Sequence, residues 1–335
     1  MRLSDPPQLS VLLPVYNAES TISRAIESIL HQSFPHFELI IVLNGCTDGS
    51  KSIVEGIEDS RIRLFYLDQP DLVKALNFGI SKSTARYIAR MDADDWSHPS
   101  RFQTQAAFLD SHPDIGLVSG KVNYTGDKKA NLGYSLYVDW ANSVDSPESI
   151  YLSRFQECAL PHPSVMFRKS VGEQYGFYRQ GDFPEDFELW NRWLQSGVRM
   201  SKVQTTVVDW YDRPGRLSRN HQMYHTDNFA EVKAHFFAEW FFSKFCTPYP
   251  RIYVWGAGSS VKKKARHLLR HGLTISKYID VKKTNSPSVI HYKDLSYSQD
   301  IFVLNYVSDR KGKVEVKKHL EKIGFSEGKS FYMME

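Results

Sequence analysis

The sequence predicts an α/β protein whose larger part is a mostly parallel sheet with helices on both faces. Three observations lead to this prediction. Apolar runs of strand length alternate with segments of helical spacing, turn residues separate them, and the chain of 335 residues is long enough for about two domains. Repeated β–α alternation favours parallel strands, because each crossover helix brings the chain back to the same edge of the sheet.

The first predicted strand and helix show this pattern most simply. Residues 9–14 form a short apolar run that ends at Pro14, and residues 20–31 then place Ile22, Ala25 and Ile29 at helical spacing. The alternation continues with strands at residues 37–43, 63–67 and 87–91 and with helices near residues 50–57 and 71–81.

After residue 95 the alternation is less regular. The polar stretch at residues 123–149 has no clear period, and we expect irregular loops there that face a substrate. Around it we expect helices near residues 99–111 and 185–197 and strands at residues 115–120 and 162–168.

A helix rich in aromatic residues precedes a second domain. Phe237, Trp240 and Phe241 are three of its aromatic residues, and a Pro-Tyr-Pro break follows it at residues 248–250. Burial between the two domains explains these side chains most simply, and contact with a lipid interface is the alternative. We therefore expect a catalytic domain at residues 1–225, a linker helix within residues 226–250 and a small α/β domain at residues 251–335.

The small domain opens with glycines in a pattern typical of dinucleotide binding. A strand at residues 251–255 leads through Gly256 and Gly258 into a helix, and Asp280 ends a second strand about twenty residues on. Val261 stands where that pattern has its third glycine. The domain resembles small Rossmann-like domains appended to some sugar-modifying bacterial enzymes. We expect a structural or oligomerising role for it, with a site for a nucleotide or another small ligand as the alternative.

The composition argues against several classes of function. With 42 basic and 38 acidic residues the net charge is +4, too small a field to predict nucleic acid as a partner. The three cysteines show no metal-ligand or disulfide pattern, and no apolar run approaches the length of about 18 residues that a membrane span needs. We expect a cytoplasmic protein, with peripheral contact at the inner face of the membrane as an option.

An acidic cluster follows the strand at residues 87–91. Asp92, Asp94 and Asp95 place three carboxylates within four residues, and such a cluster calls for a cation nearby. Hard oxygen ligands at the carboxyl end of a parallel strand suit Mg²⁺ or Mn²⁺, which would join the protein to the pyrophosphate of a nucleotide. A solvated acidic turn is the plainer alternative.

Five segments together resemble the family 2 glycosyltransferases with the GT-A fold. They are LPVYN at residues 13–17, NGCTDGS at 44–50, KALNFGI at 74–80, ARMDADD at 89–95 and EDFELW at 185–190. The resemblance covers roughly residues 8–222 and implies an inverting, metal-dependent transferase that uses a nucleoside diphosphate sugar. A sugar nucleotidyltransferase and a noncatalytic nucleotide- or glycan-binding subunit remain as alternatives from other classes.

An inverting transfer needs a base that takes the proton of the acceptor hydroxyl. Asp186 matches the family's base, and Glu185 is the second candidate. Asp186 lies at the start of a predicted helix, where the helix dipole favours an ionised carboxylate. The alternative is that Asp186 only caps this helix.

The resemblance also assigns donor, acceptor and metal residues. Asn44 occupies the turn position where the family has an acidic contact to uracil, and Arg213 stands where a histidine often precedes Pro-Gly, so that it could pair with diphosphate oxygens. The expected donor-site residues are Pro14, Tyr16, Asn17, Asn44, Asn77, Asp92, Ala93, Asp94 and Arg213. The expected acceptor-site residues are His162, Asp95 and Trp190, and the expected ligands of Mn²⁺ or Mg²⁺ are Asp94 and Asp92.

The expected reaction follows from these assignments. We expect transfer of a hexose-type residue, most simply from a UDP-sugar, to a hydroxyl of a glycan or a lipid-linked glycan during the synthesis of a surface polysaccharide. The expected partners are thus the donor, the acceptor and, as options, a membrane surface and a second copy of the chain.

Overall fold

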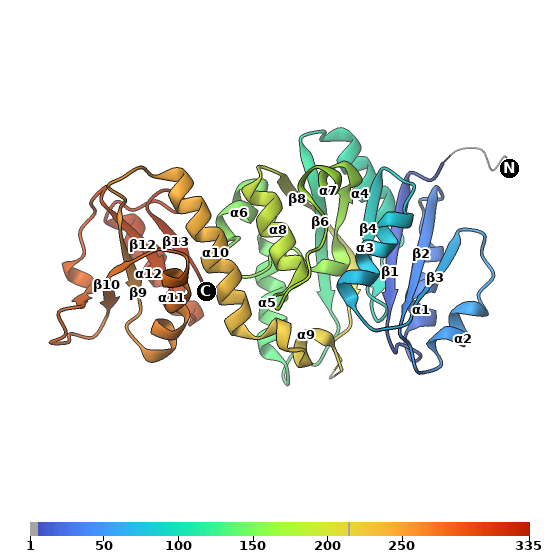
Figure 1. Cartoon of the computed structure of the whole chain (residues 1–335), viewed down its shortest axis with the longest axis horizontal. Coiled ribbons are helices and arrows are strands. Elements are labelled where there is room, and N and C mark those ends of the chain that lie inside the picture. Colours follow the sequence, from blue (N-terminus) through green and yellow to red (C-terminus); the bar gives the residue numbers. More distant parts are fainter. Residues whose placement is uncertain (1–5, 214) are drawn as a thin grey trace. The chain divides into compact units, whose positions relative to one another are not determined.

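The computed structural model describes residues 6–213 and 215–335, which Figure 1 shows coloured along the sequence. The described chain forms two compact units. The first comprises residues 6–150, 158–181, 192–213 and 215–220, and the second comprises residues 151–157, 182–191 and 221–335. The predicted domain boundaries at residues 225 and 250 stay predictions.

The first unit is built on an eight-stranded sheet with the order β3-β2-β1-β4-β7-β6-β8-β5. Its first four strands are parallel, whereas β7 runs antiparallel to both of its neighbours and β5 runs antiparallel to β8. The predicted α/β class with a mostly parallel sheet is confirmed. The strands are β1 (Leu9–Val15), β2 (Phe37–Asn44), β3 (Ile62–Leu67), β4 (Tyr87–Arg90), β5 (Trp96–Ser97), β6 (Ile115–Tyr124), β7 (Met166–Arg168) and β8 (Arg199–Trp210).

Helices connect these strands. They are α1 (Ile22–Leu30), α2 (Ser50–Glu55), α3 (Leu72–Lys82), α4 (Arg101–Ser111), α5 (Leu132–Ser143), α7 (Lys169–Tyr175) and α9 (Leu217–Asn220), with a 3₁₀ turn η1 (His162–Ser164). Two further helices, α6 (Pro147–Ser153) and α8 (Glu185–Gln195), contain residues of both units.

Two predictions about the middle of the chain were wrong. The stretch at residues 123–149 is not irregular, because it contains α5, whose Tyr134 and Tyr137 pack against the ring of Trp210 at centroid distances of 5.9 and 6.3 Å. The expected strand at residues 162–168 is only three residues long, because Pro163 lies in the 3₁₀ turn before it. At α5 contacts with a segment distant in sequence override the local sequence pattern, and at residues 162–164 a local turn does so.

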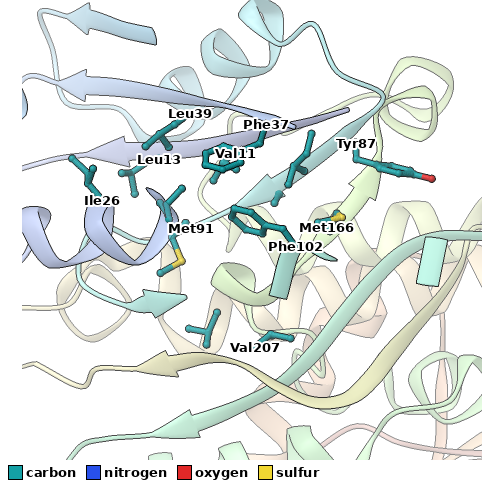
Figure 2. Close-up of a cluster of buried hydrophobic side chains, with 14 of the residues drawn as sticks. Val11, Leu13, Ile26, Phe37, Leu39, Tyr87, Met91, Phe102, Met166 and Val207 are labelled. Atoms are coloured by element: carbon teal, nitrogen blue, oxygen red, sulfur yellow. The ribbon is translucent and has the colours of Figure 1, made fainter. Parts of the chain in front are cut away.

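The core of the first unit explains why β1 and β2 are mostly apolar. Figure 2 shows side chains of β1, β2, α1 and α4 converging, among them Leu13, Ile26 and Leu39. The rings of Phe37 and Phe102 meet edge to face at a centroid distance of 5.7 Å. This buried layer fixes the strands whose carboxyl ends carry the acidic cluster.

The second unit contains a five-stranded parallel sheet with the order β11-β10-β9-β12-β13. Numbered along the chain within this sheet, the order is 3-2-1-4-5, which is typical of a Rossmann-like domain. The fold predicted for this part is confirmed. Its elements are β9 (Arg251–Trp255), α11 (Ser259–Arg270), β10 (Ile275–Asp280), β11 (Val289–His291), η3 (Tyr292–Asp294), β12 (Ile301–Asn305), α12 (Arg310–Lys322) and β13 (Phe331–Met333).

The aromatic helix belongs to this second unit. After the 3₁₀ turn η2 (Gln222–Tyr224), α10 (Thr226–Lys244) packs Phe237 against Phe302 and Trp240 against Tyr332, at ring-centroid distances of 5.7 and 4.9 Å. The aromatic side chains of α10 that face the small sheet are therefore buried within one unit and are not available as lipid anchors. Among the described residues there is no helix with the length and hydropathy that crossing a bilayer requires.

Phe237→Ala should destabilise the second unit by about 3–5 kcal/mol, the usual cost of emptying a buried phenylalanine site. Phe237 is fully buried and also meets Phe155 edge to face at 5.7 Å. Urea denaturation followed by tryptophan fluorescence would measure the loss. Phe242→Ala is the matched control, because the Phe242 side chain is 37% exposed and the same truncation there should cost less than half as much.

Candidate active site

The three aspartates that follow β4 form one compact acidic cluster. Asp92, Asp94 and Asp95 each bring a carboxylate oxygen within 4.8 Å of the others. Asp95 is fully buried, whereas Asp92 and Asp94 are partly open to solvent. The prediction that β4 delivers these carboxylates to the carboxyl end of the sheet is confirmed in geometry.

Arginines surround this cluster. Arg90 forms an ion pair with Asp92, Arg213 Nη2 lies 3.1 Å from Asp94 Oδ2, and the Arg216 guanidinium lies 3.9 Å from carboxylate oxygens of both Asp92 and Asp95. Three aspartates thus face three arginines. The positive charge that the sequence predicts near the aspartates is therefore provided by these three arginines.

The loop that follows β8 also contacts the acidic cluster through backbone hydrogen bonds. The Tyr211 N–H donates to Asp95 Oδ1 at 2.8 Å, and Arg216 donates to the Tyr211 carbonyl at 2.9 Å. Arg24 of α1 stacks on the Tyr211 ring at 3.6 Å and donates to the Asp94 carbonyl at 2.8 Å. Segments more than 100 residues apart in sequence therefore meet at the aspartates.

The pKa values of the three aspartates are set by this environment. Burial tends to raise the pKa of Asp92, but Arg90 and Arg216 outweigh it and hold the pKa below its usual value. For Asp95 burial wins: its pKa lies well above the usual value, although Arg216 opposes the shift, and the charges of Asp92 and Asp94 add to it. An additional cation would therefore stabilise the ionised form of Asp95 more than that of Asp92.

The donor set fits a divalent metal. Asp95 Oδ2 is buried and accepts no hydrogen bond from any residue within the described ranges 6–213 and 215–335. A buried carboxylate oxygen without a donor is costly unless a ligand completes it. Three carboxylates this close also match the hard oxygen ligands that Mg²⁺ and Mn²⁺ prefer.

The residues expected to hold the nucleotide lie at the ends of β1 and β2. Tyr16 follows β1 and is 52% exposed, so its ring is free to stack on a base. Asn17 has a positive φ of 46° and accepts from the Thr47 N–H at 2.8 Å, which ties this turn to the loop after β2. Pro14 lies within β1, where its ring is partly exposed.

Two further predicted donor residues are asparagines with internal roles. Asn44, at the end of β2, is buried and its Oδ1 accepts from the Asp71 N–H at 2.9 Å, which orients the amide. Asn77 of α3 donates to the Tyr178 carbonyl at 2.9 Å. Their expected contacts with the donor stay predictions, as does a role for Ala93, which lies between the aspartates and is partly buried.

His162 is buried at the 3₁₀ turn η1 and belongs to the same unit as the aspartates. Its Nε2 lies 2.6 Å from the Tyr178 hydroxyl. Burial raises the pKa of Asp92, and His162 is the third group, after Arg90 and Arg216, that opposes this shift. These contacts support a structural role for His162, and its expected place in the acceptor site stays a prediction.

The two candidate bases at the start of α8 differ in environment. Glu185 is 2% exposed, and its Oε2 accepts from the Tyr224 hydroxyl at 2.7 Å. Asp186 is partly exposed, and its Oδ1 accepts from the N–H of Phe187 at 2.7 Å. Asp186 is therefore the more accessible carboxylate of the pair, whereas Trp190, one helical turn later, is buried.

The arginines are the residues that sequence reasoning weighed least well. Arg90 ends β4 and lies two residues before Asp92, a spacing in the sequence that indicates a contact between the two side chains. Arg24 had no local signal, because its contacts join α1 to segments far away in sequence. Arg219, three residues after Arg216, pairs with Asp212 and not with the acidic cluster.

Comparison with known proteins gives consistent results. The family model described as "Glycosyl transferase family 2" matches residues 10–176. EpsE of Bacillus subtilis (strain 168), which bears a glycosyltransferase name, is 30% identical over 233 residues that cover 68% of this chain and 81% of EpsE. The O-antigen biosynthesis glycosyltransferase WbnJ of Escherichia coli is 31% identical over 209 residues, 60% of this chain and 78% of WbnJ.

Solved structures show the same fold at low sequence identity. S. aureus TarS 1-349 in complex with UDP-GlcNAc aligns with a TM-score of 0.55 at 17% identity, over 79% of this chain and 71% of that one. The mannosyltransferase PcManGT of Pyrobaculum calidifontis, in complex with GDP-Man and Mn²⁺, aligns with a TM-score of 0.54 at 16% identity, over 80% and 70%.

The raised pKa of Asp95 predicts how the stability of the metal-free protein depends on pH. A carboxyl whose pKa is higher in the folded than in the unfolded state stabilises the fold while protonated. That stability is present below the unfolded value of about 3.9 and is lost as pH rises through the folded value. Asp95→Asn removes this titration, so calorimetry in EDTA should show a Tm that falls less than the wild-type Tm between pH 4 and pH 8.

Asp114→Asn is the matched control for this measurement. Asp114 is an exposed carboxylate paired with Arg199, so its replacement should leave the wild-type pH dependence nearly unchanged. Equal pH profiles for Asp95→Asn and the wild type would show that Asp95 does not titrate as its burial implies.

Proposed function

The chain belongs to glycosyl transferase family 2 and is a glycosyltransferase, and on this premise we propose that it uses a nucleoside diphosphate sugar and inverts the anomeric centre. The proposed acceptor is a hydroxyl of a glycan or of a lipid-linked glycan. WbnJ is named for O-antigen biosynthesis, which supports a role in making a surface polysaccharide. Family membership also sets aside the alternatives of a nucleotidyltransferase and a noncatalytic subunit.

One observation carries this proposal: three carboxylates within 4.8 Å of one another, ringed by arginines, at the carboxyl end of a parallel strand. In open α/β sheets ligands bind at this edge. A site that holds both acidic and cationic side chains suits a metal-bound anion as its ligand. The carboxylates can bind the metal ion, and the arginines can pair with the anion. The structures of TarS with UDP-GlcNAc and of PcManGT with GDP-Man and Mn²⁺ support this class of donor.

We propose Asp94 and Asp92 as the ligands of Mn²⁺ or Mg²⁺, with Asp95 facing the same ion or the acceptor. When bound, such an ion neutralises the charge that grows on the diphosphate as the glycosyl bond breaks. We propose that Arg213 and Arg216 pair with diphosphate oxygens through charge-assisted hydrogen bonds. Tyr16 would stack on the base.

We propose a uridine-based donor, although Asn44 replaces the family's acidic contact. The Asn44 amide is fixed by its hydrogen bond to the Asp71 N–H, and a carbonyl oxygen can accept a second hydrogen bond through its other lone pair. A neutral acceptor at this position binds a ring N–H of uracil less strongly than a carboxylate does, so discrimination between bases should be modest.

Asp186 is the proposed base. Its carboxylate is partly exposed and lies in the first turn of α8, where the helix dipole stabilises the ionised form that can accept a proton. Glu185 is buried against the Tyr224 hydroxyl and is better suited to support the start of this helix than to meet a substrate.

Asp186→Asn should lower kcat by about 10²–10⁴-fold, the usual contribution of a general base, and leave the Kd for the donor nearly unchanged. Release of nucleoside diphosphate in the presence of acceptor measures the first quantity, and calorimetry with the donor measures the second. Glu185→Gln, which keeps a hydrogen-bond acceptor for Tyr224, should retain most of the activity. Normal turnover by Asp186→Asn would assign the base elsewhere.

A donor panel tests the proposed substrate and metal together. The protein is incubated with UDP-, GDP- and dTDP-sugars in Mn²⁺ or in EDTA, and its Tm is recorded. A UDP-sugar with Mn²⁺ should raise the Tm by several degrees, because a ligand that binds only the folded state stabilises it, and EDTA should abolish the shift. Asp94→Asn should lose the shift. A shift of the same size in EDTA would refute the proposed role of the ion.

A further inference from the structure

The arginines around the acidic cluster differ in what they contact. Arg90, Arg213 and Arg216 contact aspartate carboxylates. Arg24 of α1 instead donates from Nη2 to the main-chain carbonyl of Asp94 at 2.8 Å, and it forms no ion pair with any residue that the structure describes. Arg24 therefore acts on the main chain that carries an aspartate rather than on the carboxylate itself.

This difference matters when a divalent ion binds. Such an ion takes carboxylate oxygens as its ligands, so the arginines that contact these oxygens have to share them with the ion or release them. The hydrogen bond from Arg24 goes to a peptide carbonyl and does not use the carboxylate of Asp94. The contact can thus stay in place with or without the ion.

Arg24 also contacts the loop that follows β8. The central carbon of its guanidinium group lies 3.6 Å from the centre of the Tyr211 ring, a cation–π contact. The N–H of the same tyrosine donates to Asp95 Oδ1 at 2.8 Å. One side chain is therefore connected to two of the three aspartates, to Asp94 through a carbonyl and to Asp95 through Tyr211.

The helix that carries Arg24 is anchored in the core of the first unit. Its apolar residues Ile22, Ala25, Ile26 and Ile29 are all buried, so the backbone of α1 is held by packing along its length. A side chain positions other groups precisely only when its own backbone is fixed in this way.

The same helix supports the chain just after the aspartates. Ser28 Oγ accepts from the Ser97 N–H at 3.0 Å, and Gln32, directly after α1, donates to the Ser97 carbonyl at 3.3 Å. Both side chains are buried. Together with the contact of Arg24, these hydrogen bonds attach residues 94–97 to α1 at both ends.

We propose that Arg24 is a positioning residue for the metal site of the proposed function, on which this inference rests. It holds the main chain of Asp94 and, through Tyr211, the carboxylate of Asp95 in the arrangement that a divalent ion requires. Arg24 contacts neither the ion nor the nucleotide.

The test is a titration of full-length Arg24→Met with Mn²⁺ in the absence of nucleotide, followed by the electron paramagnetic resonance signal of the free ion. Removing a positive charge near a cation site would by itself tighten Mn²⁺ binding, whereas loss of positioning weakens it. We expect the Kd for Mn²⁺ to rise about tenfold, the usual effect of losing a hydrogen bond from a charged group. At saturating Mn²⁺ the Kd for UDP should equal the wild-type value.

Arg61→Met is the matched control. Arg61 also stacks on an aromatic ring, that of Phe37 at 4.6 Å, and also donates to a main-chain carbonyl of α1, that of Leu30 at 3.1 Å. Its ion pair is with Asp59, outside the acidic cluster. The replacement should lower the Tm and leave the Kd for Mn²⁺ unchanged.

Variants of Tyr211 test the second contact and keep the proposal testable if Arg24→Met does not fold. Tyr211→Leu removes the ring and should weaken Mn²⁺ binding, whereas Tyr211→Phe keeps the ring and should bind Mn²⁺ like the wild type. Because the ring acts through Arg24, the double variant Arg24→Met/Tyr211→Leu should bind no more weakly than Arg24→Met alone.

Three results would overturn the proposal. Unchanged or tighter binding of Mn²⁺ by Arg24→Met would limit the arginine to its charge. A weaker Kd for UDP together with an unchanged Kd for Mn²⁺ would make Arg24 a direct contact of the nucleotide. No binding of Mn²⁺ by the wild type, with or without UDP, would refute the proposed metal site itself, a failure that is distinguishable because it does not depend on any variant.

Discussion

The structure of the first unit depends on the repulsion between three neighbouring carboxylates. Two unit charges within 4.8 Å of each other repel by about 3 kcal/mol or more at an effective dielectric constant near 20. Asp95 is fully buried, and the charges of Asp92 and Asp94 add to the cost of ionising it, which raises its pKa. Arg90, Arg213 and Arg216 offset this repulsion, and two of these arginines arrive from a loop that follows β8. The acidic cluster thereby fixes the position of the loop that follows β8 in the first unit.

The same arrangement explains how a nucleoside diphosphate donor could be recognised under the proposed function. Arginines that neutralise aspartates in the free protein are also the groups that pair best with phosphate oxygens. A divalent ion that binds the aspartates takes over their neutralisation and leaves the arginines for the diphosphate. Under the proposed function, metal and donor therefore bind cooperatively, since each supplies the counter-charge that the other leaves unpaired.

The sequence predicted the parts of the fold that local patterns determine. Strands such as β1 and β2 are almost completely buried and appear as mostly apolar runs, and the acidic motif marks the end of β4 directly. The sequence-based predictions were wrong where packing between distant segments determines the structure. The helix α5 forms partly because its tyrosines contact Trp210 on β8, a strand that was not predicted. In the candidate site, sequence motifs identified the aspartates. Only the fold shows that Arg24 stacks on the Tyr211 ring and that Glu185 accepts a hydrogen bond from the Tyr224 hydroxyl.

The aromatic residues of α10 show how burial changes the interpretation of a sequence pattern. Phe237, Trp240 and Phe241 are buried, and Phe237 and Trp240 pack against rings of the small sheet in the second unit. Phe242 of the same helix is 37% exposed, so only the face of α10 toward the sheet is removed from contact with a lipid interface. The membrane alternative therefore has fewer aromatic side chains to rely on than the sequence alone indicates.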